Sequence, residues 1–154
     1  MRIACAFDHA GVPLREVVLG AVAAAGHEAV DLGGTDPDSG DDYPDHALAV
    51  ARAIRAGEAE RGILVCGSGA GVAVAACKIE GIRAVMAHDT YTAHQCVEHD
   101  RVNVLAMGAR VIGEAIAAEL VAAFANAEPS GEERHVRRSR KVDLIERDGL
   151  GAEL

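Results

Sequence analysis

Short apolar runs alternate along this chain with longer stretches in which apolar positions recur at helical spacing. Five of these runs are predicted as strands, at residues 2–7, 28–33, 62–66, 82–87 and 103–107. The stretches that follow them are predicted as helices, at residues 13–26, 44–57, 71–78, 90–99 and 113–126. Such alternation is typical of parallel βαβ units, so we expect an α/β fold with a five-stranded, doubly wound parallel sheet.

A last helix follows residue 126, after a polar loop, and no strand comes after it. A helix added to a finished sheet often packs on a partner subunit, so residues from about 127 to 154 are expected to form an arm that contacts a second copy. The chain has 154 residues, half of them hydrophobic, which is enough for one well-covered core. We therefore expect a single domain over residues 1–154.

The charge of the chain is strongly acidic, with 24 acidic against 15 basic residues and a net charge of −9. This balance argues against nucleic acid or an anionic membrane as a partner. Four arginines nevertheless cluster within residues 134–140. They favour a local site for a small anionic ligand.

The N-terminal residues lack the charged and long apolar regions of a signal peptide, and no window is apolar enough to span a bilayer. We expect a soluble, cytoplasmic protein. The four cysteines, at positions 5, 66, 77 and 96, lack paired-motif spacing and are predicted to be free thiols.

The carboxyl ends of the predicted strands carry most of the polar chemistry. The segments at these ends are "DHAG" at 8–11, the polar loop at 33–45, "CGSGAG" at 66–71, "HD" at 88–89 and "GAR" at 108–110. Ligands of open parallel sheets bind at this edge. We therefore expect the functional site there.

Cys66 stands directly before the glycine-rich segment that opens the third predicted helix. The segment resembles a phosphate-binding loop, although it has neither the Walker ending nor the GxGxxG pattern. A tight strand-to-helix turn explains its glycines equally well. The helix N-terminus would favour a thiolate at Cys66, but a small core residue is the alternative, and the residues alone leave both open.

Three further sets of side chains are candidates for chemistry. Asp8 and His9 end the first strand, either as a cap with a surface histidine or as part of a ligand site. His94, Cys96 and His99 do not share one helical face, so we predict no metal site there and favour His99 as an acid or base. Arg134 and Arg138 are four residues apart and share a face, which suits a two-pronged grip on phosphate.

Taken together, the motifs resemble the ribose-5-phosphate isomerase B and galactose-6-phosphate isomerase family. The segments that carry the resemblance are "DHAG" at 8–11, "DYPD" at 42–45, "CGSGAG" at 66–71 with "AACKIEGIRA" after it, "HDRVNVLAMGARVIG" at 99–113 and "RHVRR" at 134–138. They extend along nearly the whole chain in the family's order. The resemblance implies a Rossmann-like three-layer αβα sandwich and a homodimer, sometimes paired into tetramers, with active sites between subunits. It also implies aldose–ketose isomerisation through a cis-enediolate, without metal or cofactor.

The resemblance also assigns roles to single residues. It implies that Cys66 is the catalytic base, that Ser68 assists proton transfer between oxygens and that His99 opens the sugar ring. The glycines of the loop, Gly67, Gly69 and Gly71, would stabilise the enediolate through their N–H groups. The implied sugar hydroxyl contacts are Asp8 and Tyr43, and the implied phosphate contacts are His9, Arg110, Arg134 and Arg138.

Two positions depart from the family pattern. Asp100 and Cys77 each stand where the family usually has Asn. A carboxylate at position 100 would place negative charge near a developing enediolate, unless it is protonated or turned away. The expected substrate is ribose 5-phosphate, with tetrulose (erythrulose), allose and galactose phosphates as alternatives. A phosphate- or nucleotide-binding module and a thiol redox protein are the other hypotheses.

Overall fold

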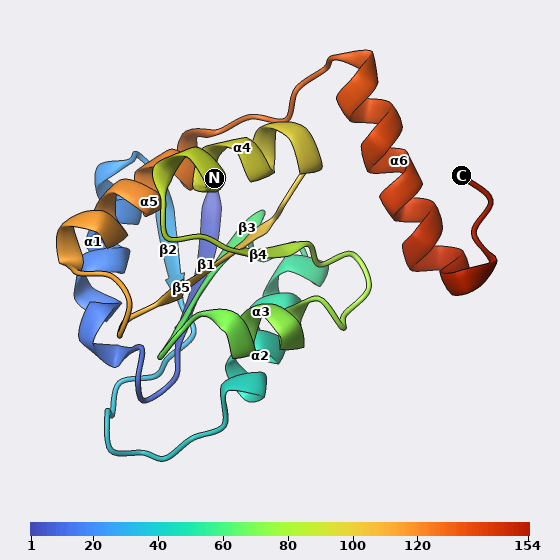
Figure 1. Ribbon diagram of the computed structural model, residues 1–154. Helices are drawn as coiled ribbons and strands as arrows, with labels where there is room; N and C mark the ends of the chain where they lie inside the picture. The colour runs from blue at the N-terminus through green and yellow to red at the C-terminus, as the bar shows by residue number, and fades with distance from the viewer.

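The computed structural model describes residues 1–154 and confirms the α/β fold, with a five-stranded sheet whose strands all pair in parallel (Figure 1). The strands are β1 (Arg2–Phe7), β2 (Glu28–Asp31), β3 (Arg61–Cys66), β4 (Ala84–Met86) and β5 (Val104–Gly108). Their order across the sheet is β2-β1-β3-β5-β4. β2 ends two residues earlier than predicted because Gly33 and Gly34, with φ of 99° and 82°, turn the chain away.

The helices are close to their predicted positions. They are α1 (Arg15–Ala24), α2 (Tyr43–Arg55), α3 (Ala70–Ala76), α4 (Thr90–Asp100), α5 (Glu114–Asn126) and α6 (Glu133–Asp148), with 3-10 turns at Val12–Leu14 and Gly149–Gly151. None of them is long and apolar enough to cross a membrane.

Two hydrophobic clusters, one on each face of the sheet, make the three layers. Ile3, Phe7 and Leu105 belong to the cluster formed with α1, α4 and α5. On the other face, the small Ala4 and Ala106 face α2 and α3. Successive residues of β1 thus point to opposite faces, as the period of a strand requires. The core has few aromatic residues, and small Ala and Val side chains let the helices pack close to the sheet.

The direction of winding changes between β1 and β3, which are neighbours in the sheet. From β1 the chain continues to β2 on one side, and from β3 it continues to β4 and β5 on the other side. The crevice outside the carboxyl ends of these two strands is therefore the switch point at which parallel sheets bind ligands. Gly11 belongs to this crevice, because a Cβ there would lie 2.1 Å from the carbonyl oxygen of Val65.

The helix α6 stands apart from the sandwich in Figure 1, at the end of the loop that follows α5. Arg83 holds it to the body by donating to Ser139 Oγ at 2.7 Å and by pairing with Asp143. The Gly81 N–H adds a second tie to Glu146, at 3.0 Å.

Candidate active site

A pocket of about 380 Å³ opens at the switch point. Its lining residues are Asp8, His9, Ala10, Tyr43, Cys66, Gly67, Ser68, Gly71, Arg110 and Val111. They come from the segments after β1, β3 and β5 and from the start of α2, because parallel strands bring their carboxyl ends to one edge. The structure thus gathers most of the predicted site residues in one pocket.

Cys66 is the last residue of β3 and is buried, with its side chain on the α2 and α3 face of the sheet. The N–H of Gly69 donates to Cys66 Sγ at 3.1 Å. This hydrogen bond fixes the position of the Cys66 sulfur at the wall of the pocket.

The glycine loop owes its shape to close backbone contacts. Gly69 has a φ of 83°, and a Cβ there would lie 3.0 Å from both Met107 and Met86. Of the three predicted glycine donors, Gly69 already donates its N–H to sulfur. The N–H groups of Gly67 and Gly71 have no acceptor within the chain. These two N–H groups border the pocket, where they can donate to an oxyanion.

The segment after β1 presents a carboxylate and an imidazole to the pocket. Asp8 is buried and its Oδ1 accepts from the Gly11 N–H at 2.9 Å, so the turn itself fixes this carboxylate. His9 is partly exposed, and its Nδ1 lies 2.9 Å from Asp41 Oδ1. That hydrogen bond is the main cause that raises the pKa of His9.

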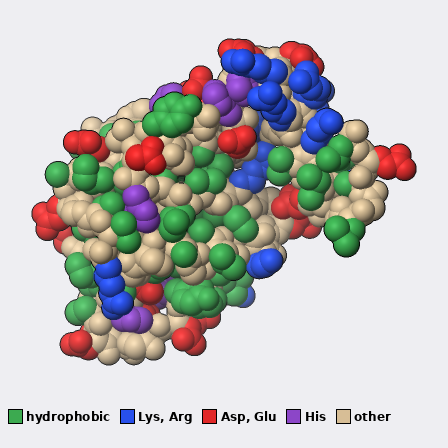
Figure 2. Space-filling view, in the orientation of Figure 1, with side chains coloured by type: hydrophobic (Ala, Val, Ile, Leu, Met, Phe, Trp, Pro, Cys, Tyr) green, Lys and Arg blue, Asp and Glu red, His purple; other side chains and the backbone are tan.

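A second group of predicted residues lies around the end of α4 and the start of α6. The His99 ring stacks on His135, with centroids 3.9 Å apart and planes at 21°. His135 is buried, and this burial, with the charges of His99 and Arg134, lowers its pKa. Arg134 pairs with Glu132 at 2.8 Å, whereas the exposed Arg138 makes no ion pair. Figure 2 shows basic side chains gathered at this end of α6, beside histidines.

The two groups lie at opposite edges of the sheet. Cys66 is the last residue of β3, at the carboxyl edge, whereas His99 and Asp100 end α4, which runs back to the amino edge before β5 begins. Figure 1 shows the end of α4 and the start of α6 at the top, and the loops after β1 and β2 at the bottom. One chain therefore does not bring His99, Asp100, Arg134 and Arg138 to the pocket that holds Cys66.

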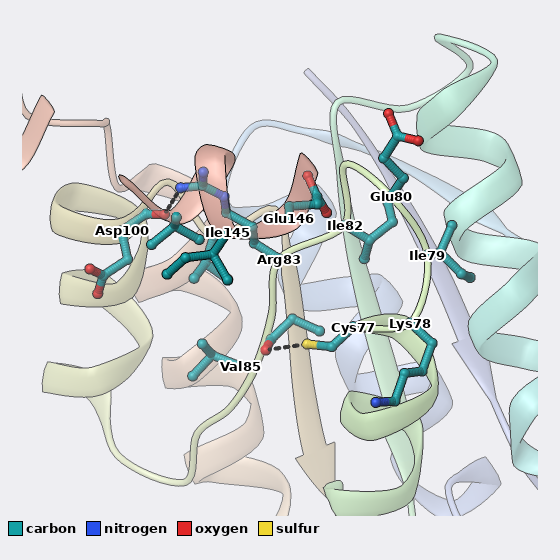
Figure 3. Close-up of a pocket in the computed structure, with 13 residues that line it drawn as sticks. Cys77, Lys78, Ile79, Glu80, Ile82, Arg83, Val85, Asp100, Ile145 and Glu146 are labelled. Atoms are coloured by element: carbon teal, nitrogen blue, oxygen red, sulfur yellow. Dashed lines mark hydrogen bonds between the residues drawn. The ribbon is translucent and has the colours of Figure 1, made fainter. Parts of the chain in front are cut away.

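A larger cavity of about 680 Å³ separates α6 from the turn between α3 and β4 (Figure 3). Its lining is mainly aliphatic and includes both departures from the family pattern, Cys77 and Asp100. Cys77 Sγ donates to the Ala84 carbonyl at 3.3 Å, and the Asp100 carbonyl accepts from Arg83 at 2.7 Å. The exposed Asp100 carboxylate lies at the rim of this cavity, away from Cys66 of the same chain.

Cys5 and Cys96 do not form a redox site with Cys66, because they lie on the opposite face of the sheet. All four are free, as predicted. Burial raises the pKa of Cys5 to about 12 and that of Cys96 to about 11, so both stay protonated thiols at neutral pH. Cys5 lies on the face of the sheet opposite to Cys66, which excludes it as a resolving partner. No three His, Cys, Asp or Glu side chains converge as metal ligands would.

Asp41, His46 and His135 are the neighbours of the site that the sequence did not single out. Asp41 is one of several acidic residues in a polar loop, and nothing in the local pattern separates it from the others. His135 does carry a signal, since it stands beside Arg134 in the basic cluster at the start of a helix.

Comparison with known proteins decides the family. The model of the family described as Ribose/Galactose Isomerase matches residues 3–142. The chain belongs to the ribose/galactose isomerase family. It is accordingly an aldose–ketose isomerase of the ribose-5-phosphate isomerase B type.

Relatives in the ribose/galactose isomerase family include enzymes with different substrates in their names. Ribose-5-phosphate isomerase B of Escherichia coli is 39% identical over 94% of this chain and 96% of its own length. D-erythrulose-4-phosphate isomerase of Pectobacterium atrosepticum is 37% identical over 85% of this chain and 86% of its own. The type B ribose 5-phosphate isomerase of Trypanosoma brucei has a solved structure that superposes with a TM-score of 0.88, at 42% identity over 92% of this chain and 96% of that one.

Family membership also decides between the functional hypotheses drawn from the sequence. An isomerase needs a base, a proton relay and donors for an enediolate, and the pocket holds a thiol, a hydroxyl and free N–H groups.

Proposed function

We propose that the enzyme interconverts an aldose phosphate and its ketose, with ribose 5-phosphate and ribulose 5-phosphate as the preferred pair. The observation that carries this proposal is the buried Cys66 sulfur at the pocket, held by the Gly69 N–H within a ring of polar groups. Cys66 takes the proton from C2 of the open-chain aldose and returns it to C1. Ser68 moves the hydroxyl proton between O1 and O2, so that the reaction is balanced without an oxidant or a cofactor.

The remaining pocket residues suit the rest of such a substrate. The Gly67 and Gly71 N–H groups face the developing enediolate oxygens. Asp8 accepts hydrogen bonds from the sugar hydroxyls, and the Tyr43 hydroxyl can accept or donate one. His9 and Arg110 supply positive charge for the phosphate at the outer end of the pocket.

A second copy of the chain completes the site in this proposal. His99, Arg134 and Arg138 cannot reach the pocket of their own chain, but a symmetric dimer places equivalent surfaces of two chains opposite each other. In that arrangement His99 of the second copy opens the sugar ring, and Arg134 and Arg138 of the second copy close on the phosphate. The unpaired Arg138 supports this role.

The substrate is tested with a panel of four-, five- and six-carbon aldose and ketose phosphates, by kcat/KM and by incorporation of solvent deuterium. We expect ribose 5-phosphate to rank first, with deuterium entering the product. A higher kcat/KM for a tetrose or hexose phosphate would contradict the assignment of ribose 5-phosphate as the preferred substrate. The Asp100→Asn variant, run on the same panel, shows whether this carboxylate is the cause.

The assignment of the base is tested with Cys66→Ala. We expect kcat to fall by about 10² to 10⁴, the range of general acid–base catalysis, with the fold unchanged by circular dichroism. Cys77→Ala, which removes a thiol outside the pocket, is the matched control. Unchanged turnover in Cys66→Ala would overturn the assignment.

A further inference from the structure

One carboxylate joins two imidazoles at the mouth of the pocket. Asp41 Oδ1 accepts from the backbone N–H of His9 at 2.8 Å and lies 2.9 Å from Nδ1 of the same residue. Its Oδ2 lies 2.5 Å from His46 Nε2. His46 belongs to the first turn of α2, so Asp41 connects the segment after β1 with that helix.

This geometry selects the state of the His9 ring. With the Nδ1–H donating to Asp41, only Nε2 remains for the pocket that His9 lines. In the neutral ring Nε2 carries a lone pair, which repels an anion, whereas the protonated ring donates a hydrogen bond from Nε2. His9 can therefore bind an anion well only as an imidazolium.

The charges around His9 differ in sign. The groups around the His9 ring come from several elements. They are Asp8 from the same segment, Asp41 from the loop before α2, Tyr43 and His46 from α2, Cys66 from β3 and Arg110 from the segment after β5. The hydrogen bond to Asp41 raises the pKa of His9, and the charge of Asp8 adds to this, whereas burial works to lower it. Partial burial works to raise the pKa of Asp41, but hydrogen bonds from His9 and His46 bring it down to about 2, so the carboxylate is ionised throughout the neutral range.

We propose that Asp41 is a positioning residue, which orients the His9 imidazole toward the pocket and keeps it in the charged form that binds the phosphate of the substrate. The proposal rests on the proposed function, because the anion is taken to be a sugar phosphate. It goes beyond that function by naming a residue that acts through His9 and makes substrate affinity depend on pH.

The test replaces Asp41 by Asn, which keeps an oxygen for the His9 N–H but removes the charge. Loss of an opposite charge at this distance lowers a pKa by about one unit, which cuts the imidazolium fraction by a factor that rises to about ten once the pH exceeds both pKa values. We therefore expect Asp41→Asn to raise KM for ribose 5-phosphate up to about tenfold at pH 7.5, with kcat within about twofold of wild type. The difference in KM between Asp41→Asn and the wild type disappears near pH 5.5, where the His9 ring is protonated in both proteins.

Asp38→Asn is the matched control, because it removes the same charge from the same loop and its side chain makes no hydrogen bond. NMR titration of His9 follows the ring directly, and its pKa should fall in Asp41→Asn and not in Asp38→Asn. An unchanged His9 pKa, or a lowered pKa with an unchanged KM profile, would overturn the proposal.

A failure of the proposed function has a different signature. If the wild type isomerises no sugar phosphate, binding of inorganic phosphate is measured by calorimetry at pH 7.5 and 5.5 instead. Weaker binding by Asp41→Asn at the higher pH alone supports the role of Asp41, and equal binding by both proteins overturns it.

Discussion

Gly71 faces the ring of Tyr43 at the wall of the pocket, and a Cβ at this position would lie 3.0 Å from the ring. This contact lets the first turn of α3 approach the first turn of α2, so that the Gly71 N–H and the Tyr43 hydroxyl serve one small cavity. At the scale of single residues, the shape of the pocket therefore depends on the missing side chain of Gly71 as well as on the ring of Tyr43.

Gly71→Ala is expected to displace the Tyr43 ring and raise KM roughly tenfold, since small misplacements in a site are costly. The measurement is steady-state kinetics with ribose 5-phosphate. Gly20→Ala is the control, because a Cβ at Gly20, inside α1, meets nothing within 4 Å. We expect this control to leave KM unchanged and to stabilise the fold by about 0.5 to 1 kcal/mol. A normal KM in Gly71→Ala would show that Tyr43 has room to move.

The sequence made Cys66 a candidate because its place between a strand and a glycine loop is a local feature. It could not single out Asp41, which has the same local surroundings as Asp36 or Asp38. Its difference arises only when the loop folds back over His9, a residue 32 positions away. Long-range hydrogen bonds of this kind leave no periodic pattern in a single sequence.

Among the elements, α6 depends most clearly on a few specific contacts. Its buried residues are His135 and Ser139, and Arg83 donates to both the hydroxyl and the carbonyl of Ser139. The Arg83 backbone is held in turn by Asn103, whose Oδ1 accepts from it at 2.9 Å. The arginines proposed to close on the phosphate are thus oriented from the amino edge of the sheet.

Arg83→Ala is expected to loosen α6 and raise KM by about 3- to 10-fold, because the three hydrogen bonds of Arg83 to α6 are lost and water replaces them only in part. Hydrogen exchange should show faster exchange within residues 133–148. Arg147→Ala is the control, because Arg147 pairs only with its neighbour Asp148. If exchange in α6 and KM both match the wild type, Arg83 does not determine the position of the helix.

Elements with regular patterns were predicted well from the sequence, and their ends less so. In β1 and β3 the apolar runs coincide with the buried residues, and in α2 and α5 the apolar residues at helical spacing do. The predicted strand at 82–87 is observed as Ala84–Met86, and it starts later because the Arg83 N–H donates to the Asn103 side chain and not to a neighbouring strand. Such competition between a strand and tertiary contacts is not visible in local propensity.

For the whole molecule, the central feature of the proposed function is that one chain carries two halves of a site at opposite ends of its strands. Cys66, Ser68 and His9 line the pocket and would form one half, and His99 and Arg134, which both contact His135, would belong to the other. The sequence indicated the members of both halves, but the order of strands and the direction of α4 decide which members meet. An acidic chain in which four arginines gather within residues 134–140 fits the proposed binding of a small anion between two copies.

A shared site is tested most directly by mixing two inactive variants, Cys66→Ala and His99→Asn, by co-expression with different tags. In a mixed dimer, Cys66 of one chain meets His99 of the other in one of the two sites, so random pairing should restore about a quarter of the wild-type activity. Pairing Cys66→Ala with the double variant Cys66→Ala/His99→Asn leaves no intact site and is the control. Recovery in the first mixture alone is the result predicted, and mixed dimers as inactive as their parents would contradict a site built from two chains.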